Sequence, residues 1–509
     1  MADAHPSPGH LGQRALESYL WGAANLLRGL IDAGDYKQYV FPLLFFKRLS
    51  DVWDEDYRNA FDETGDRGYA EATANDRFII PDGAHWSDVR RAARDVGRTL
   101  RTAFRAIETA NPERLAGVFG NAPWTDKAQM PDATLKNLIE HFSKRTLSLA
   151  AVPEDELGNS YEYLVKQFAD DSGHTAQEFY TNRTLVHLMT QMLRPRTGDR
   201  IYDPTAGTGG MLISALAEVQ RNGGDARTLR LYGQEIIGTT ASIARMNLVL
   251  HGVEDFRIAV GNALSDPAFI ERDRLMPFDV VLANPPYSIK AWNRDAWLDD
   301  PWARNILGTP PQGRADYAFF QHILQSLDRK TGRCAILFPH GVLFRQDEAA
   351  MRRALIERDL VECVLGLGPN LFYNSPMEAC VVICRTQKLP ERRGKVLFID
   401  AVRQVARERA QSFLTPEHQK RILAAYEVFA DEPGFAAVAA QDEVLANDCN
   451  LSILRYVRRS TDADADTQTG GDLRQAWTDF HAGSAAFWRD MDDVVAMVDR
   501  IAAESQSDG

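Results

Sequence analysis

The chain has 509 residues, a formal net charge of −13, and 45% hydrophobic and 25% charged residues. Its length exceeds what one hydrophobic core supports, so we expect roughly two or three domains in a protein of ordinary globular composition. No apolar run approaches the roughly 20 residues of a membrane span, and residues 1–10 lack a signal peptide's basic and apolar regions, so a cytoplasmic protein without membrane contact is expected. The acidic balance argues against a protein that grips nucleic acid unaided, because such proteins carry a basic surface.

Residues 1–150 are predicted to form an N-terminal helical domain. In residues 36–51, apolar side chains dominate almost all round the expected helix, a pattern typical of a helix packed on several sides. Farther on, five arginines recur at spacings of four, four, three and four, which places them on one face of a predicted helix: Arg90, Arg94, Arg98, Arg101 and Arg105. That row is either a solvated face or a set of phosphate contacts.

Residues 151–460 are expected to form a doubly wound α/β domain, because strand-like and helix-like segments alternate there. The clearest unit is a strand at 200–203, a glycine loop at 204–210 and a helix at 211–219. Glycines permit positive φ and let a ligand approach the backbone, while the helix N-terminus offers free N–H groups. Leu212 stands where a dinucleotide fingerprint needs its third glycine, and no Walker lysine follows, so a nucleotide-type pocket without a phosphate cradle is predicted.

Four successive strands are predicted to end in polar residues: Asp203, Glu235, Asn262 and Asn284. Each residue alone is more often a turn or cap residue than a ligand. Four in series beside a glycine loop favour a ligand-binding edge, because ligands of open α/β sheets lie outside the carboxyl ends of the strands. Glu235 is placed as an acid that accepts hydrogen bonds from ribose hydroxyls.

The strand at 278–283 leads directly into Asn284-Pro285-Pro286-Tyr287. Two prolines stop the strand and stiffen the turn, so a rigid ledge carrying an amide and an aromatic ring is expected. These residues alone are also compatible with an ordinary proline-rich turn. Further strands at 334–339, 361–367 and 379–384 bring the expected sheet to about seven strands.

The five cysteines lie mostly in apolar, strand-like runs and include no CxxC pair: Cys334, Cys363, Cys380, Cys384 and Cys449. Reduced core thiols are therefore expected, rather than disulfides or a structural metal site.

Residues 461–509 are predicted to be a polar, low-complexity linker followed by a C-terminal helical tail. Mostly apolar residues alternate spacings of four and three from Leu473 to Ile501, which is the a/d stripe of a helix that docks on another helix. The docking helix belongs either to a partner protein or to the chain itself.

Taken together, these motifs resemble the modification subunit of type I restriction–modification systems, an S-adenosylmethionine-dependent N6-adenine DNA methyltransferase. The segments that match in order are residues 39–49, 177–181, 203–210, 233–235, 245–248, 284–287, 316–319 and 447–451. The resemblance covers nearly the whole chain. It implies a doubly wound, mostly parallel, seven-stranded methyltransferase sheet with an N-terminal helical domain and a C-terminal helical tail.

The resemblance also implies the residues of the site. The cofactor S-adenosylmethionine would be held by Glu178, Phe179, Tyr180, Thr181, Asn182, Arg183, Asp203, Gly207, Thr208, Gly209, Gly210, Glu235 and Asn262. The catalytic residues would be those of the ledge: Asn284, Pro285, Pro286 and Tyr287. Two positions depart from the family pattern, because Asn182 replaces a proline and Asn262 replaces an aspartate, which leaves their effect on cofactor affinity open.

Physical chemistry explains why the ledge suits this reaction. The exocyclic nitrogen of adenine is a poor nucleophile, because its lone pair is delocalised into the ring. Acceptors from the Asn284 side chain and the Pro285 backbone, aimed at the two N–H hydrogens, would localise that pair in line with the methyl group. Tyr287 would stack on a base flipped out of the duplex. No metal or covalent intermediate is needed.

The implied partners are double-stranded DNA, a specificity subunit that reads the DNA site, and a second copy of the chain. Whether a restriction (nuclease–translocase) subunit joins them is left open by the sequence. Two other functions also stay open on the residues alone. The ledge could serve any planar NH2 group, as in a methyltransferase of protein glutamine or RNA, or the chain could be a non-catalytic assembly module of a defence complex.

Overall fold

The computed structural model describes residues 12–171, 181–287, 289–369, 371, 378–408 and 411–458. The chain divides into two compact units, residues 1–457 and residues 458–509. The predicted linker and tail at 461–509 lie outside the described residues, as do Glu178, Phe179 and Tyr180 of the predicted cofactor segment. The domain boundaries near 150 and 460 stay predictions.

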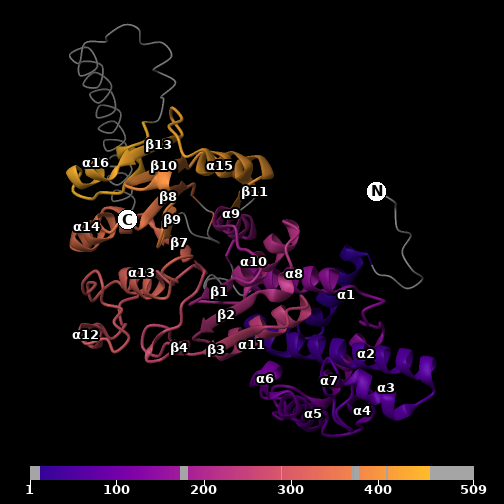
Figure 1. The fold of residues 1–509 in the computed structure, drawn as a ribbon. Coiled ribbons are helices and arrows are strands. Elements are labelled where there is room, and N and C mark those ends of the chain that lie inside the picture. The colour runs from indigo at the N-terminus through magenta and orange to yellow at the C-terminus, as the bar shows by residue number, and fades with distance from the viewer. Residues whose placement is uncertain are drawn as a thin grey trace, which may run out of the picture. The chain divides into compact units, whose positions relative to one another are not determined.

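Helices dominate the N-terminal part of the described chain (Figure 1): α1 (Gln13–Asn25), α2 (Lys37–Thr64), α3 (Arg67–Ala74), α4 (Trp86–Arg91), α5 (Val96–Ala110), α6 (Pro112–Leu115), α7 (Asp132–Ser143) and α8 (Glu154–Asp171). Every residue of α2 from 39 to 52 is buried. This confirms the prediction of a helix packed on several sides. Apolar residues of α1, α5, α7 and α8 complete the same core, among them Leu16, Leu100, Leu138 and Leu164.

The prediction that one helix carries all five arginines is wrong. Helix α4 ends at Arg91 and α5 begins at Val96, with Asp95 between them in the left-handed region at φ 52°. The break is held from outside, because the carboxylate of Asp132 accepts hydrogen bonds from the backbone N–H groups of Asp95 and Val96, both at 3.1 Å. One face of α5 keeps only the last three arginines of the row: Arg98, Arg101 and Arg105.

The predicted doubly wound, mostly parallel sheet is confirmed, and it extends to nine strands: β1 (Arg200–Asp203), β2 (Arg230–Glu235), β3 (Phe256–Val260), β6 (Val280–Ala283), β7 (Arg333–Pro339), β8 (Val361–Leu367), β9 (Ala379–Arg385), β10 (Lys395–Ala401) and β13 (Ala436–Ala440). Their order is β13-β10-β8-β9-β7-β6-β1-β2-β3. Strands β9 and β13 run antiparallel to their neighbours. All seven expected strands are present, and β10 and β13 lengthen the sheet at one edge. The two short hairpins are β4 (Ile270–Glu271) with β5 (Arg274–Leu275), and β11 (Ala406–Glu408) with β12 (Gln411–Phe413).

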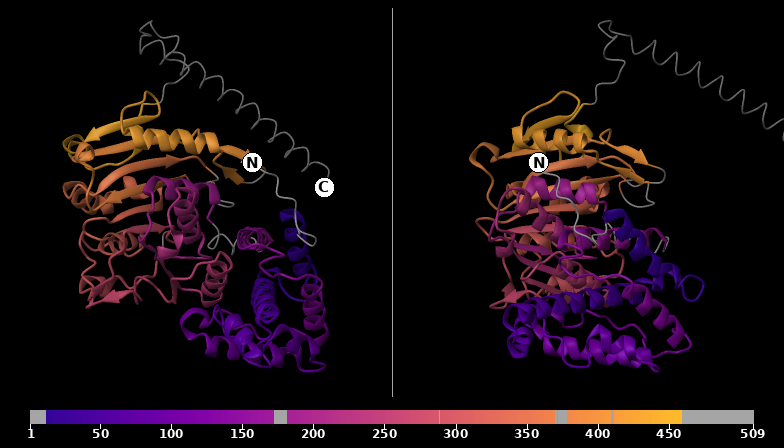
Figure 2. Two further views of the ribbon diagram at one scale, coloured as in Figure 1. Left: turned by 45° about the vertical axis from the view of Figure 1, so that its right-hand side comes forward. Right: turned by 90° about the vertical axis from the view of Figure 1, so that its right-hand side faces the viewer.

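Helices cover both faces of the sheet (Figures 1 and 2). Successive strand residues point to opposite faces, so Val280 and Leu282 of β6 enter one core while Val281 and Ala283 enter the other. The first core is closed by α9 (Arg183–Leu193), α10 (Gly210–Arg221), α11 (Gly238–Leu250) and α15 (Pro416–Val428). The second is closed by α13 (Asp316–Gln325), α14 (Ala349–Glu357) and α16 (Gln441–Ala446), with α12 (Arg294–Leu298) in a satellite cluster.

Helix α11 joins the helical part to the sheet. Ala241, Ala244 and Leu248 pack on the sheet side, whereas Ile243 and Met246 belong to the core formed by α1 to α8. A spacing of three or four residues separates the members of each set, so one helix presents two apolar stripes. Helix α11 therefore packs on the sheet with one side and on the N-terminal helices with the other.

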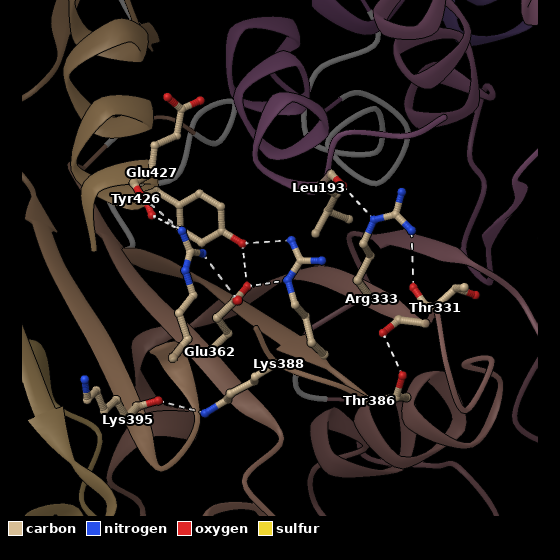
Figure 3. A network of polar contacts seen from close by, with 12 residues as sticks. Leu193, Thr331, Arg333, Glu362, Thr386, Lys388, Lys395, Tyr426 and Glu427 are labelled. Atoms are coloured by element: carbon tan, nitrogen blue, oxygen red, sulfur yellow. Dashed lines mark hydrogen bonds and ion pairs between the residues drawn. The ribbon is translucent and has the colours of Figure 1, made fainter. Parts of the chain in front are cut away.

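A buried ionic network fastens α15 to the sheet at the edge opposite the carboxyl ends of the parallel strands (Figure 3). Glu362 of β8 is fully buried and accepts hydrogen bonds from Arg385 Nε at 2.6 Å and from the Tyr426 hydroxyl at 2.5 Å. Arg392 Nη1 lies 3.3 Å from its other oxygen. One buried carboxylate thus contacts two guanidinium groups, and its single negative charge balances one of the two positive charges.

All five cysteines are buried and free, which confirms the prediction of reduced core thiols. Cys334 and Cys384 face each other across β7 and β9. Within the ranges that the structure describes, no helix combines the length and the apolar character needed to cross a membrane.

Candidate active site

The glycine loop connects β1 to α10 and needs its glycines for specific reasons. Gly207 and Gly209 have φ values of 53° and 82°, in the left-handed region where a side chain is strained. A Cβ on Gly210 would lie 1.4 Å from Nη1 of Arg183. The loop is tied to the next strand, because the backbone N–H of Ala206 donates to the carbonyl of Gln234 at 2.9 Å.

Two carboxylates stand at the ends of adjacent strands, Asp203 on β1 and Glu235 on β2. Asp203 is 2% exposed and accepts a hydrogen bond from the backbone N–H of Thr205 at 2.9 Å. Glu235 accepts from the N–H groups of Gly207 and Ile237, each at 2.9 Å. Burial, followed by the charge of Glu235, raises the pKa of Asp203 to about 7. Near neutral pH this carboxyl is therefore present in both protonation states.

Beside the two acids lies an apolar surface that the sequence did not single out. Ile236, directly after β2, is 62% exposed, and Val260, at the end of β3, is 52% exposed. The strand register pairs Val260 with Glu235, so both apolar side chains flank the same carboxylate. One sequence signal marks this surface, an isoleucine directly after an acid at a strand end. The exposure of the Ile236 and Val260 side chains becomes visible only once the sheet is assembled.

Asn182 holds the start of α9. Its side-chain oxygen accepts from the backbone N–H of Thr184 at 3.0 Å, and its Nδ2 donates to the carbonyl of Ser412 at 2.8 Å. The residue is buried, so this amide caps the helix and ties it to β12 where the family pattern has proline. Arg183, next in the chain, forms an ion pair with Glu162 of α8.

The loop after β3 is fixed by a second amide and by an arginine that the sequence did not indicate. Asn262 accepts from the backbone N–H of Leu264 at 2.9 Å. Arg304 is 1% exposed, pairs with Asp300 at 2.6 Å, and donates to the carbonyls of Ala263 and Leu264 at 2.9 and 2.7 Å. The segment after the ledge is thereby pinned to the loop after β3.

The ledge follows β6 and is internally hydrogen-bonded. Asn284 is half-buried; its Nδ2 donates to Thr181 Oγ1 at 3.0 Å and its Oδ1 accepts from the Tyr287 hydroxyl at 2.8 Å. Pro285 is buried and Pro286 is exposed. Burial raises the pKa of Tyr287 well above its usual value, so its hydroxyl stays a donor.

The structure thus brings Thr181, of the predicted cofactor segment, into direct contact with Asn284. It sets Asp203, Glu235, Asn262 and Asn284 at the carboxyl ends of strands that are neighbours in one sheet. Thr208 of the glycine loop is buried, and its carbonyl accepts from Asn247 at 2.9 Å.

A buried ion pair lies behind Tyr287. Asp316, in the first turn of α13, accepts from Arg345 Nη1 at 2.7 Å, and Arg345 also reaches Glu348 at 3.3 Å. The charge of Asp316 helps burial to raise the pKa of Tyr287. Burial raises the pKa of Glu348 to about 7. The sequence match at 316–319 indicated this element but not its ionic partner.

Comparisons with known proteins agree on one family. Residues 16–142 match the HsdM N-terminal domain, and residues 152–465 match the N-6 DNA Methylase model. The chain is 32% identical over 389 residues to the type I restriction enzyme HindI methylase subunit of Haemophilus influenzae, covering 72% of this chain and 84% of that protein. It is 29% identical to the MjaIX methylase subunit of Methanocaldococcus jannaschii, covering 87% and 83%.

A solved structure shows the same fold. The crystal structure of the type I restriction–modification system methyltransferase subunit from Streptococcus thermophilus superimposes with a TM-score of 0.77 at 30% identity, covering 88% of this chain and all of that one. A modification subunit of a type I restriction enzyme from Vibrio vulnificus gives a TM-score of 0.64 at 19% identity, which supports the fold alone.

Proposed function

Because this chain belongs to the N-6 DNA methylase family, with the methylase subunits of type I restriction enzymes, we propose that it methylates N6 of adenine in double-stranded DNA with S-adenosylmethionine as the methyl donor. The observation that carries the proposal is the amide of Asn284, held between Thr181 and Tyr287 at the end of β6. The neighbouring strands end in the carboxylates of the cofactor pocket.

The residues of the pocket fit this cofactor. S-adenosylmethionine supplies a methyl group on a positively charged sulfonium, together with an ammonium, a ribose diol and an adenine ring. Glu235 and Asp203 are buried carboxylates, and the charge of Glu235 makes ionisation of Asp203 more costly, so a cationic, hydroxyl-bearing ligand would stabilise the ionised pair. Ile236 offers exposed apolar surface beside Glu235 for a flat ring. Residues 178–180 stay proposed cofactor contacts.

At the target base, the ledge works through acceptors. Asn284 Oδ1 and the carbonyl of Pro285 accept the two N6–H hydrogens, which draws the nitrogen lone pair out of conjugation. A neutral amide does this without acquiring charge, so the desolvated site contains no competing ion. Tyr287 leaves Asn284 and stacks on the base, which has to be flipped out of the duplex to reach the ledge.

The chain acts on DNA that a partner selects. Its net charge of −13 opposes unaided binding to phosphates, and its relatives are named as subunits. We therefore assign sequence reading to a specificity subunit that two copies of this chain accompany, with residues 473–505 as the docking helix. Deleting these residues is expected to abolish co-purification with the specificity subunit, whereas undiminished co-purification would refute the docking role.

The proposed reaction is tested in the host. Genomic DNA is sequenced for N6-methyladenine in cells with and without the gene for this chain. We expect modified adenines at one recurrent sequence only when the gene is present. Identical adenine methylation in both strains would exclude the proposed activity.

A further inference from the structure

Three arginines on α5 form a row of positive charge. Arg98, Arg101 and Arg105 are all exposed, and their spacing of three and four residues places them on one helix face. Among the residues that the structure describes, none of the three has a carboxylate partner within ion-pair distance. The acids closest in sequence, Asp95 and Glu108, interact electrostatically with Arg98 and Arg105 respectively, but their direct contacts lie elsewhere. Asp95 pairs with Lys127 at 2.5 Å, and Glu108 accepts from the backbone of Phe119 at 3.0 Å.

The helix that carries the row is firmly packed. Its opposite face is buried through Val96, Leu100 and Ile107, and the ring of Phe104 stacks on Phe119 with centroids 4.1 Å apart. Because the backbone of α5 is fixed by this packing, the three guanidinium groups are presented at set positions. Only their side chains have to be ordered when a partner binds.

The row differs from the two arginines of α4. Arg90 of α4 forms a bidentate pair with Glu140, at 2.9 and 2.8 Å, and Arg91 pairs with Asp88. The chain has 71 acidic and 58 basic residues, so acidic partners for three more arginines were available to its surface. A row left without them, on an acidic protein, is suited to an anion supplied from outside.

We propose that Arg98, Arg101 and Arg105 bind successive phosphates of the duplex on which the chain acts, an inference that rests on the proposed DNA methyltransferase function. Seven helical residues span about 10 Å. Phosphates of one strand advance by about 3.4 Å per base pair along the duplex axis, so three successive phosphates cover about 7 Å of that axis, a length within reach of three long guanidinium side chains spread over the row. Such contacts fix the position of the duplex and carry no sequence information. They leave sequence reading to a partner.

The salt dependence of DNA binding tests this assignment. The triple variant Arg98→Gln/Arg101→Gln/Arg105→Gln keeps good helix formers at all three positions. Binding of the full chain together with its proposed specificity subunit to a fluorescent duplex of arbitrary sequence is measured between about 50 and 200 mM salt. Each lost phosphate contact lowers the slope of log K against log salt by about 0.9, so the slope is expected to fall by about 2 to 3.

A matched triple variant separates the row from net charge. Arg14, Arg58 and Arg67 are exposed on α1, α2 and α3, and their change to Gln removes the same charge. We expect the control slope to stay within about 0.5 of wild type, because it removes no phosphate contact. An equal fall in both triples would show a net-charge effect and overturn the proposal.

Two further outcomes have defined meanings. If the wild-type protein methylates DNA and the α5 variant has an unchanged salt slope, the proposal that the row binds phosphates is refuted and the proposed function still stands. Absence of DNA methylation by wild type, in the same preparation, overturns the proposed function itself. Loss of co-purification with a protein partner, with an unchanged slope, would assign the row to an acidic protein surface and refute binding to DNA.

Discussion

Cofactor affinity is expected to depend on pH through Asp203. This carboxyl is 2% exposed, and burial with the neighbouring Glu235 raises its pKa from 3.8 to about 7. A cationic cofactor stabilises the ionised form, so the protonated fraction of the free protein must lose its proton on binding. Well below this pKa, cofactor affinity falls about tenfold for each pH unit. Because the pKa of about 7 lies midway between pH 8 and pH 6, the total loss of affinity over that range is about tenfold.

Calorimetric titration of the full chain with S-adenosylmethionine at pH 6, 7 and 8 measures this effect. The α-amino group of S-adenosylmethionine also titrates near this pH range, so part of any pH dependence belongs to the ligand. Asp203→Asn serves as the reference variant, because it keeps the ligand's titration and lacks that of Asp203. We expect the variant to bind more weakly at pH 8 and to lack the loss at pH 6. Proton release on binding is expected near pH 6, from the wild type only. Equal pH profiles for wild type and variant would refute the role given to Asp203.

Substitutions at three other positions have defined outcomes. Asn284→Ala removes the acceptor for the N6–H hydrogens, so kcat for methyl transfer is expected to fall about 100- to 1000-fold while calorimetry shows unchanged cofactor affinity. Tyr287→Phe keeps the aromatic ring and removes the hydrogen bond to Asn284, so its rate of methyl transfer is expected to stay within about tenfold of wild type. Tyr287→Ala loses base stacking worth about 1–3 kcal/mol, which is measured as a higher KM for DNA. Glu362→Gln leaves the buried Arg392 and the partly buried Arg385 without their counterion, so denaturant unfolding should show a loss of about 3–5 kcal/mol.

Each of these outcomes has a control or a contradiction. Wild-type kcat in Asn284→Ala would remove the amide from the mechanism. Equal rates for Tyr287→Phe and Tyr287→Ala would show that the ring does not stack on the base. For Glu362, the exposed pair between Arg77 and Glu154 is the reference, because Glu154→Gln is expected to cost about 0–1 kcal/mol.

The sheet and the ledge could be predicted because their signals are local. Apolar runs bounded by glycine, proline and polar residues mark strands, and a proline pair after residues 278–283 marks a turn whatever surrounds it. The polar ends of β1, β2, β3 and β6 meet because parallel strands align their carboxyl ends. Local sequence therefore supplied both the elements of the site and their common edge.

Features set by distant partners could not be predicted. The five arginines predicted to share one helix, from Arg90 to Arg105, are interrupted by a break that Asp132 of α7 stabilises. Residues 92–95 themselves contain nothing that forbids a helix. The contact of Asn284 with Thr181 joins residues 103 positions apart. Arg304, which pins the loop after β3, has only its burial in the folded chain to identify it.

Asn182 shows how a departure from a family pattern is explained by structure. A proline before α9 would fix the backbone but offer no side-chain hydrogen bond. The amide of Asn182 instead caps the helix at Thr184 and reaches Ser412 of β12. Asn182 thus contributes two side-chain hydrogen bonds at this turn that a proline there would not provide.

The central claim is transfer of a methyl group to N6 of adenine in DNA, and labelled methyl transfer tests it most directly. The chain and its specificity subunit are incubated with methyl-labelled S-adenosylmethionine and duplex DNA, which is then digested to nucleosides. We predict that the label appears as N6-methyldeoxyadenosine and disappears with Asn284→Ala. Label in protein, in RNA or in a cytosine nucleoside would contradict the account.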